Sequence, residues 1–229
     1  MGDVEADWSP VAGNPLPTTL SGVSVTVNDT PAVLSHISPA SITLLVPGSL
    51  TGDSAKIVIQ RSGISGNPAW VPITHALPAI YSVADPNASP TQYYASVTTA
   101  GVGMRLSIVN PKGAILGNSA VDARAVRGVY PGESIDIYAS GLGATSPDFP
   151  TDRLITSART VAGTVRVHFG ATIAAADSAM LVEPGVYQVR VTVPSTLAAG
   201  LVPLALDVNG LTSTASVLMK VDNNPAASR

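Results

Sequence analysis

One stretch of the sequence, residues 131–143, constrains the fold more than any other. It opens with a Pro-Gly pair, continues with Ile135, Ile137 and Ala139 separated by polar residues, and ends at a Gly-Leu-Gly bend. Apolar residues at every second position are typical of a strand with one buried face. The Gly and Pro residues indicate turns at both ends. The stretch therefore predicts the opening strand of an immunoglobulin-like β-sandwich.

The rest of the chain predicts an all-β protein made of two tandem immunoglobulin-like sandwiches. Its 229 residues fit two such domains of about 100 residues each. The 19 prolines and 20 glycines favour short strands joined by many turns. We expect an N-terminal tail over residues 1–14 and a first sandwich over residues 15–84. Residues 85–229 would hold a connector hairpin (85–127) and the second sandwich.

Several segments carry the alternation expected of strands, and the clearest of them lie in the second half. In residues 22–28 the valines Val23, Val25 and Val27 share one face. Within the connector, residues 93–97 and 104–109 can pair across a Gly-rich turn. The second sandwich continues through further segments, namely residues 163–169, 172–176, 180–182, 186–193, 202–208 and 214–221.

The two halves of the chain repeat. Pro47 and Pro194 each end an apolar strand, Gly63 and Gly210 each lie in the following hairpin, and both pairs differ by 147 positions. The glycines before an earlier strand, at 22 and 163, differ by 141. The second copy is therefore expected to carry six additional residues, and we place them around residues 183–185.

The smaller offset predicts that the first sandwich lacks its opening strand. The counterpart of Glu133 would fall at position −8, before the first residue of the sequence, because 133 minus 141 is −8. An unpaired edge of this kind is normally covered in proteins. Three covers are possible: the segment around Trp8, the connector strand with Tyr93 and Tyr94, or a strand from another chain. For self-association through the N-terminal segment the candidate residues are Val4, Trp8 and Val11.

Several of these segments resemble a family, the uncharacterised C-terminal domain of secreted Solibacter and other acidobacterial proteins. The resemblance covers residues 15–221. It is carried by residues 16–28, 38–47, 77–81, 109–113, 130–147 and 187–194, and the run from Tyr130 to Pro147 is its most specific part. It implies paired modules of the transcription-factor-immunoglobulin type on exported or surface proteins, with no site residues to carry over. Two departures stand out, the missing opening strand and Asn28-Asp29 in place of Asn-Gly.

The location and partners expected from these features are those of a surface protein. The N-terminus has no signal-peptide h-region, so an extracellular or cell-surface location would apply to a mature or excised form. The net charge of −3 gives no attraction to nucleic acid, and no apolar run approaches the roughly 18 residues of a membrane helix. We expect the partner to be a second copy of the chain or other domains of a larger surface protein.

Catalytic and metal sites are weakly indicated. The chain has no cysteine, and His36, His75 and His168 show no metal-ligand spacing. Neither a Gly-x-Ser-x-Gly elbow nor a phosphate-binding Gly-Lys-Ser/Thr loop is present. We predict no enzyme activity and no cofactor. Acids close in sequence could form a carboxylate pair or a calcium site; these are Glu133 with Asp136, Asp148 with Asp152, and the trio Asp3, Glu5 and Asp7.

Two functions are left to weigh. The first is a non-catalytic structural or adhesive module pair that assembles by strand donation into a surface layer or filament. The alternative is a carbohydrate-binding module, which needs exposed aromatic residues on one face. The chain has two Trp, six Tyr and two Phe in all. Tyr93, Tyr94 and Tyr138 are the candidates for such a glycan platform.

Overall fold

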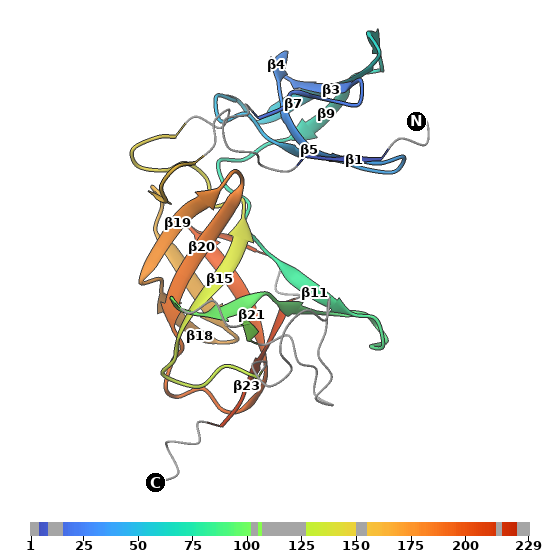
Figure 1. The fold of residues 1–229 in the computed structure, drawn as a ribbon. Coiled ribbons are helices and arrows are strands. Elements are labelled where there is room, and N and C mark those ends of the chain that lie inside the picture. Colours follow the sequence, from blue (N-terminus) through green and yellow to red (C-terminus); the bar gives the residue numbers. More distant parts are fainter. Residues whose placement is uncertain are drawn as a thin grey trace. The chain divides into compact units, whose positions relative to one another are not determined.

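A computed structural model of the chain describes residues 5–8, 16–101, 105–106, 127–149, 155–213 and 217–223. Every regular element among these residues is a β-strand, so the prediction of an all-β protein is confirmed (Figure 1). The chain divides into two compact units. The first unit holds residues 1–75 with residues 148–157 and 183–185, and the second unit holds residues 76–147, 158–182 and 186–229.

The first unit contains two small sheets. One has the order β1-β5-β6; the other has the order β2-β3-β7-β8, with β4 paired to β3 and β9 paired to β7. The strands are β1 (Ala6–Asp7), β2 (Thr19–Leu20), β3 (Val23–Val27), β4 (Thr30–Pro31), β5 (Val33–Ile37), β6 (Ile42–Leu45), β7 (Ser54–Arg61), β8 (Ile64–Ser65) and β9 (Ala69–Pro72).

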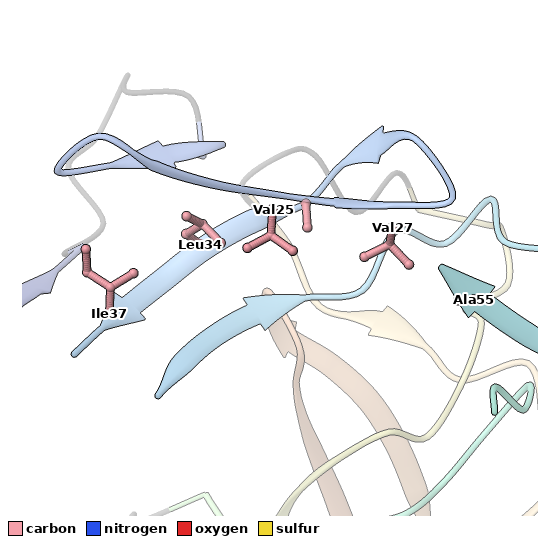
Figure 2. Packing of buried hydrophobic residues seen from close by; sticks show 6 residues of the cluster. Val25, Val27, Leu34, Ile37 and Ala55 are labelled. Carbon is pink, nitrogen blue, oxygen red and sulfur yellow. The ribbon is translucent and has the colours of Figure 1, made fainter. Parts of the chain in front are cut away.

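The core of the first unit lies where β3, β5 and β7 meet. Alternation places Val25 and Val27 on the inner face of β3, and Leu34 and Ile37 project from β5 into the same cluster (Figure 2). Six residues of this cluster are buried, and Ile42 and Leu44 of β6 are among the apolar residues that pack against it while only partly buried. The core is therefore small.

The second unit contains the strands β10 (Ala79–Ile80), β11 (Ser82–Asp85), β12 (Gln92–Ala95), β13 (Val97–Thr99), β14 (Arg105–Leu106), β15 (Ser134–Ser140), β16 (Arg159–Thr160), β17 (Val165–Phe169), β18 (Thr172–Ala175), β19 (Ser178–Glu183), β20 (Val186–Thr192), β21 (Gly200–Val208), β22 (Leu211–Thr212) and β23 (Val217–Val221). They form two seven-stranded sheets. One has the order β14-β13-β15-β20-β19-β16, with β10 paired to β15. The other has the order β11-β12-β23-β21-β17-β18, with β22 paired to β21.

The inner residues of both large sheets are apolar and buried, as expected for a β-sandwich. On β15, Ile135, Ile137 and Ala139 are all fully buried, which agrees with the face predicted for residues 131–143. Figure 1 shows β15, β20 and β19 side by side in one layer. The other layer includes an unusual contact, because β12 pairs in parallel with β23 through Tyr93 and Val217.

The predicted boundary and connector differ from the structure. Residues 76–84, which we placed in the first sandwich, belong to the second unit. The segment predicted as a separate connector instead supplies strands to both large sheets: β12 pairs with β23, and β13 pairs with β15. The predicted hairpin within it is present in part, as Val97 and Thr98 pair with residues 105–106 of β14. The remainder lies outside the described residues.

The ladder registers support the internal repeat and correct one offset. Val23 pairs with Arg61 in the first unit, and Val165 pairs with Val208 in the second. The difference between 165 and 23 is 142, and that between 208 and 61 is 147. The second copy therefore has five additional residues between these strands, not six. The offset of 141 between the two glycines is one too small, because Gly22 lies one residue before β3 whereas Gly163 lies two residues before β17.

Candidate functional site

The edge of β6 is where the two copies of the repeat differ most. With the offset of 147, β6 corresponds to residues 189–192 of β20. In the second unit β20 lies between β15 and β19. In the first unit β6 pairs with β5, the counterpart of β19, and among the described residues no strand pairs with its other side. The place that β15 occupies in the second unit is unfilled by any described strand of the first.

The backbone groups on this open side can be assigned from the ladders. The Trp8 amide donates to the Ser35 carbonyl at 2.9 Å, so Ser35 faces β1 and the next residue, His36, faces β6. Thr43, the partner of His36, therefore directs its N–H and C=O toward β5. By alternation, Ile42 and Leu44 direct theirs toward the open side.

The second unit shows how these backbone groups are satisfied when a strand is present. Val193 exchanges hydrogen bonds with residues 132 and 133, which places Val189 and Val191 in hydrogen-bonded pairs with Ile137 and Ile135. Val189 and Val191 are the counterparts of Ile42 and Leu44. An incoming strand antiparallel to β6 would meet the same arrangement of donors and acceptors.

Side-chain burial points to the same missing strand. Leu206 on β21 is fully buried, whereas its counterpart Ile59 on β7 is 37% exposed. Val189 and Val191 are fully buried, whereas Ile42 and Leu44 are only partly buried. The apolar side chains that β15 adds to its core have no counterpart among the described residues of the first unit.

The segment around Trp8 does not fill this gap. Its strand, β1, lies beside β5 (Figure 1) and pairs with it through Ala6 with Ile37 and Asp7 with His36. The sheet order β1-β5-β6 puts β1 on the side of β5 away from β6. A 2.7 Å contact joins Asp7 Oδ1 to His36 Nδ1. The position matches that of β16, which pairs with β19 in the second unit. Of the three self-association candidates, Trp8 thus lies near β5, and Val4 and Val11 lie outside the described residues.

The connector strand that we predicted as a second possible cover is also paired with other strands. Tyr93 and Tyr94 lie on β12, which pairs with β11 and β23 inside the second unit. Neither segment of this chain that we considered as a cover therefore pairs with the open side of β6. Sequence reasoning missed Ile42, Thr43 and Leu44 as site residues. The repeat could have identified them, because it aligns them with the strand next to β15.

The three tyrosines predicted to form a glycan platform do not share an exposed face: one is buried, and the other two lie on different sheets. Tyr94 is fully buried and donates its hydroxyl to Gln92 Oε1, so it cannot present a ring to a sugar. Tyr93 is 44% exposed on β12, whereas the partly buried Tyr138 lies on β15 in the other large sheet. Trp70, which we did not single out, is 67% exposed on β9 opposite Lys56.

Glu133 and Asp136, one of the predicted carboxylate pairs, are each held by an arginine. Asp136 is buried and accepts two hydrogen bonds from Arg190, at 2.8 and 2.9 Å. The hydrogen bond with Asp136 raises the pKa of Arg190 above its usual value. Glu133 accepts two hydrogen bonds from Arg127, at 2.6 and 2.9 Å. The two carboxylates thus take part in separate ion pairs and not in one site.

The Arg127 pair belongs to a polar cluster at the start of β15. The guanidinium carbon of Arg127 lies 3.8 Å from the ring centre of Tyr130, and Glu133 also accepts the Tyr130 amide. Asp222 accepts the Gly128 amide at 2.7 Å. These contacts fix the turn before β15 and tie it to the end of β23.

The other predicted site residues are dispersed as well. His36 lies on β5, His168 lies on β17, and the exposed His75 lies outside any strand, so no two of the three histidines share an element. Within the described residues, no three His, Cys, Asp or Glu side chains lie together as a metal site would require. Asp3 and Asp152 fall outside those residues. A search of the same part of the chain finds no helix suited to crossing a membrane.

Comparison of the chain with protein-family models, with curated proteins and with solved structures finds no match.

Proposed function

We propose that this chain is a non-catalytic structural subunit whose first unit accepts a β-strand from another polypeptide along the open side of β6. The observation that carries the proposal is the difference between equivalent strands, since β20 pairs on both sides and β6 pairs on one side in the described residues. Strand addition to an exposed sheet edge is an established mode of recognition, in which backbone hydrogen bonds give affinity and alternate side chains give specificity.

The expected chemistry of the incoming strand follows from β15. It runs antiparallel to β6, presents apolar side chains next to Ile42 and Leu44, and presents a polar side chain next to Thr43. The apolar side chains would cover Ile59 and the partly buried face of β6. Their burial and the new ladder would stabilise the first unit, with about 25 cal/mol gained for each Å² of apolar surface removed from water.

A peptide from the second unit provides the test, because residues 130–142 contain β15, which has no counterpart among the described residues of the first unit. We expect a labelled peptide of this sequence to bind the full chain with 1:1 stoichiometry in fluorescence anisotropy. In amide exchange followed by NMR, binding should slow exchange at Ile42 and Leu44. Thr43, whose amide already faces β5, should change little.

Two N-methylated peptides serve as matched controls that leave the protein unchanged. Methylation of the Ile135 and Ile137 amides removes the donors that would bond to β6 and should abolish binding. Methylation of the Asp136 and Tyr138 amides alters N–H groups that face away from β6 and should preserve it. Equal binding of the two peptides, or no binding of the unmodified one, would refute the proposal.

The carbohydrate-binding alternative has one observation in its favour, the exposed Trp70 on β9, which lies opposite Lys56 of β7. A ring exposed on a flat sheet can stack on a sugar, and polar neighbours can bond to its hydroxyl groups. A glycan array run with the wild-type chain and with Trp70→Ala tests this alternative. Binding that is lost in the variant would support it, and absence of binding by the wild-type chain would dismiss it.

A further inference from the structure

We infer that the segment received by the first unit bridges both of its sheets: it continues from the open side of β6, turns across Val46 and pairs in parallel with the end of β9. This inference rests on the proposed strand-accepting function and adds a second anchor, which defines the partner more narrowly. It is carried by a second comparison within the repeat, between β9 and β23.

Strand β9 is the counterpart of β23 and has an open side that β23 lacks. Val71 pairs with Ala55 in the first unit, Met219 pairs with Val202 in the second, and the difference between 219 and 71 is 148. In the second unit β23 lies between β12 and β21. Among the described residues of the first unit, β9 pairs with β7 alone.

The second unit shows which segment covers the end of β23. The Val129 amide donates to the Lys220 carbonyl at 2.9 Å, and the Asp222 amide donates to the Val129 carbonyl at 2.8 Å, in a parallel bridge. The Val129 side chain is fully buried. Because β15 begins only five residues later, one continuous segment contacts both large sheets.

The same backbone groups are open at the end of β9. With the offset of 148, Pro72 and Thr74 take the places of Lys220 and Asp222. The Ile73 amide donates to the Asp53 carbonyl of the β7 side at 3.0 Å, so the Pro72 carbonyl and the Thr74 amide point to the other side. No described backbone group bonds to either of them. Proline has no N–H, but the bridge needs only its carbonyl, and proline within a sheet is confined to edge strands.

Side-chain burial along the two strands supports the comparison. The inner residues of β23 are all buried, and each counterpart on or just after β9 is less buried. The buried residues are Val217, Met219 and Val221, and their counterparts are the exposed Ala69 and the partly buried Val71 and Ile73. The core of the first unit is therefore uncovered on this side as well as beside β6.

Val46 marks the path between the two open sides. It directly follows β6 and is 53% exposed, whereas its counterpart Val193, 147 positions later, is fully buried. The Val193 amide donates to the Glu133 carbonyl at 2.8 Å, and its carbonyl accepts the Gly132 amide at 2.9 Å. The turn between Val129 and β15 thus bonds to Val193, and an equivalent turn would bond to Val46.

The partner is therefore an extended polypeptide with a defined pattern. It carries an apolar residue for β9 and, six positions later, the first inner residue of an alternating strand, as Val129 and Ile135 do. Between them it needs a tight turn with a residue that tolerates positive φ, as Gly132 does at +82°.

Two peptides that differ by two residues test the inference on the full chain. In fluorescence anisotropy, we expect residues 128–142 to bind about tenfold more tightly than residues 130–142, which is about the gain from burying one valine side chain. In amide exchange followed by NMR, both peptides should slow exchange at Val46, and only the longer one should slow exchange at Thr74.

Two variants of the longer peptide serve as controls that leave the protein unchanged. Methylation of the Val129 amide removes the donor to the Pro72 carbonyl. The double substitution Gly128→Val with Val129→Gly keeps length and composition but moves the apolar side chain to the other side of the segment. Both variants should bind about as weakly as residues 130–142.

The outcomes separate this inference from the proposed function. Equal affinity of the two unmodified peptides, with unchanged exchange at Thr74, would overturn the bridge to β9 and leave strand acceptance by β6 in place. Full affinity of both control variants would also overturn the bridge. Failure of both unmodified peptides to bind would remove the inference and the proposed function together.

Discussion

The substitution Gly141→Ala provides a sharp test of how β15 is held in the second unit. Gly141 follows β15 directly and has a φ of +72°. A Cβ added there would lie 2.0 Å from the carbonyl oxygen of Leu77, and this oxygen belongs to the backbone and cannot rotate away. The Leu77 amide also donates to the Gly141 carbonyl at 2.9 Å. The chain must therefore separate at this point for any side chain to fit.

A matched control separates the clash from the effect of φ. Gly132, in the turn before β15, has a φ of +82°, and an added Cβ would meet nothing within 4 Å. Gly132→Ala should cost about 1 kcal/mol, the usual penalty for a left-handed conformation in a residue with a Cβ. Gly141→Ala should cost about 3 kcal/mol or more, because it also breaks the Leu77 hydrogen bond and displaces β10 from β15.

The two variants can be compared by thermal and urea unfolding followed by circular dichroism. For a unit of this size each kcal/mol lowers Tm by about 2–4 °C, so we expect a shift of about 6–12 °C for Gly141→Ala and about 2–4 °C for Gly132→Ala. Fluorescence provides an internal control, since the two tryptophans, Trp8 and Trp70, both lie in the first unit. Equal shifts for the two variants would refute the role assigned to the Leu77 contact.

Three further predictions concern other contacts. Tyr187 donates its hydroxyl to the Gly143 carbonyl at 2.6 Å, so Tyr187→Phe should cost about 1–2 kcal/mol in urea unfolding, and a cost below 0.3 kcal/mol would contradict this role. Burial raises the pKa of Tyr187 above its usual value of 10. The contribution of this side chain to stability is therefore complete below pH 10 and falls as the pH rises through the folded-state pKa. The phenylalanine variant should accordingly lose less stability above pH 10 than the wild type. Asp136→Ala leaves the partly exposed Arg190 without its buried partner and should lower the free energy of unfolding by about 2–3 kcal/mol. A double-mutant cycle with Arg190→Ala should give a coupling energy above 0.5 kcal/mol. Additive effects of the two substitutions would show that the pair does not interact.

Local patterns predicted most strands because alternation depends on near neighbours. The faces of β3, β15 and β20 are those expected from the sequence. The type of the turns also follows from short signals, since Asn209 and Gly210 have the positive φ values of 51° and 88° that favour these residues in two-residue hairpins.

Long-range pairing was not predictable from the sequence. The connector segment was predicted as a hairpin alongside the second sandwich and not as part of its sheets, because nothing in residues 92–95 indicates that they pair with β23. The burial of one of the two tyrosines was predictable from the sequence. Neighbouring residues of a strand face opposite sides, so Tyr93 and Tyr94 could not both face solvent on a sheet with one buried face. The segment around Trp8 was considered as a cover for the missing opening strand, but the structure pairs its strand β1 with β5, on the side away from β6.

The parallel pairing of β12 with β23 has a consequence for the newly made chain. Tyr93 pairs with Val217, and the difference between these positions is 124 residues. A ribosome that adds about 5–20 residues per second needs about 6–25 seconds to make that span. Until then β12 has no neighbour on that side, so the second unit can close only after β23 has been made, whereas strands β1 to β9 of the first unit have been made long before.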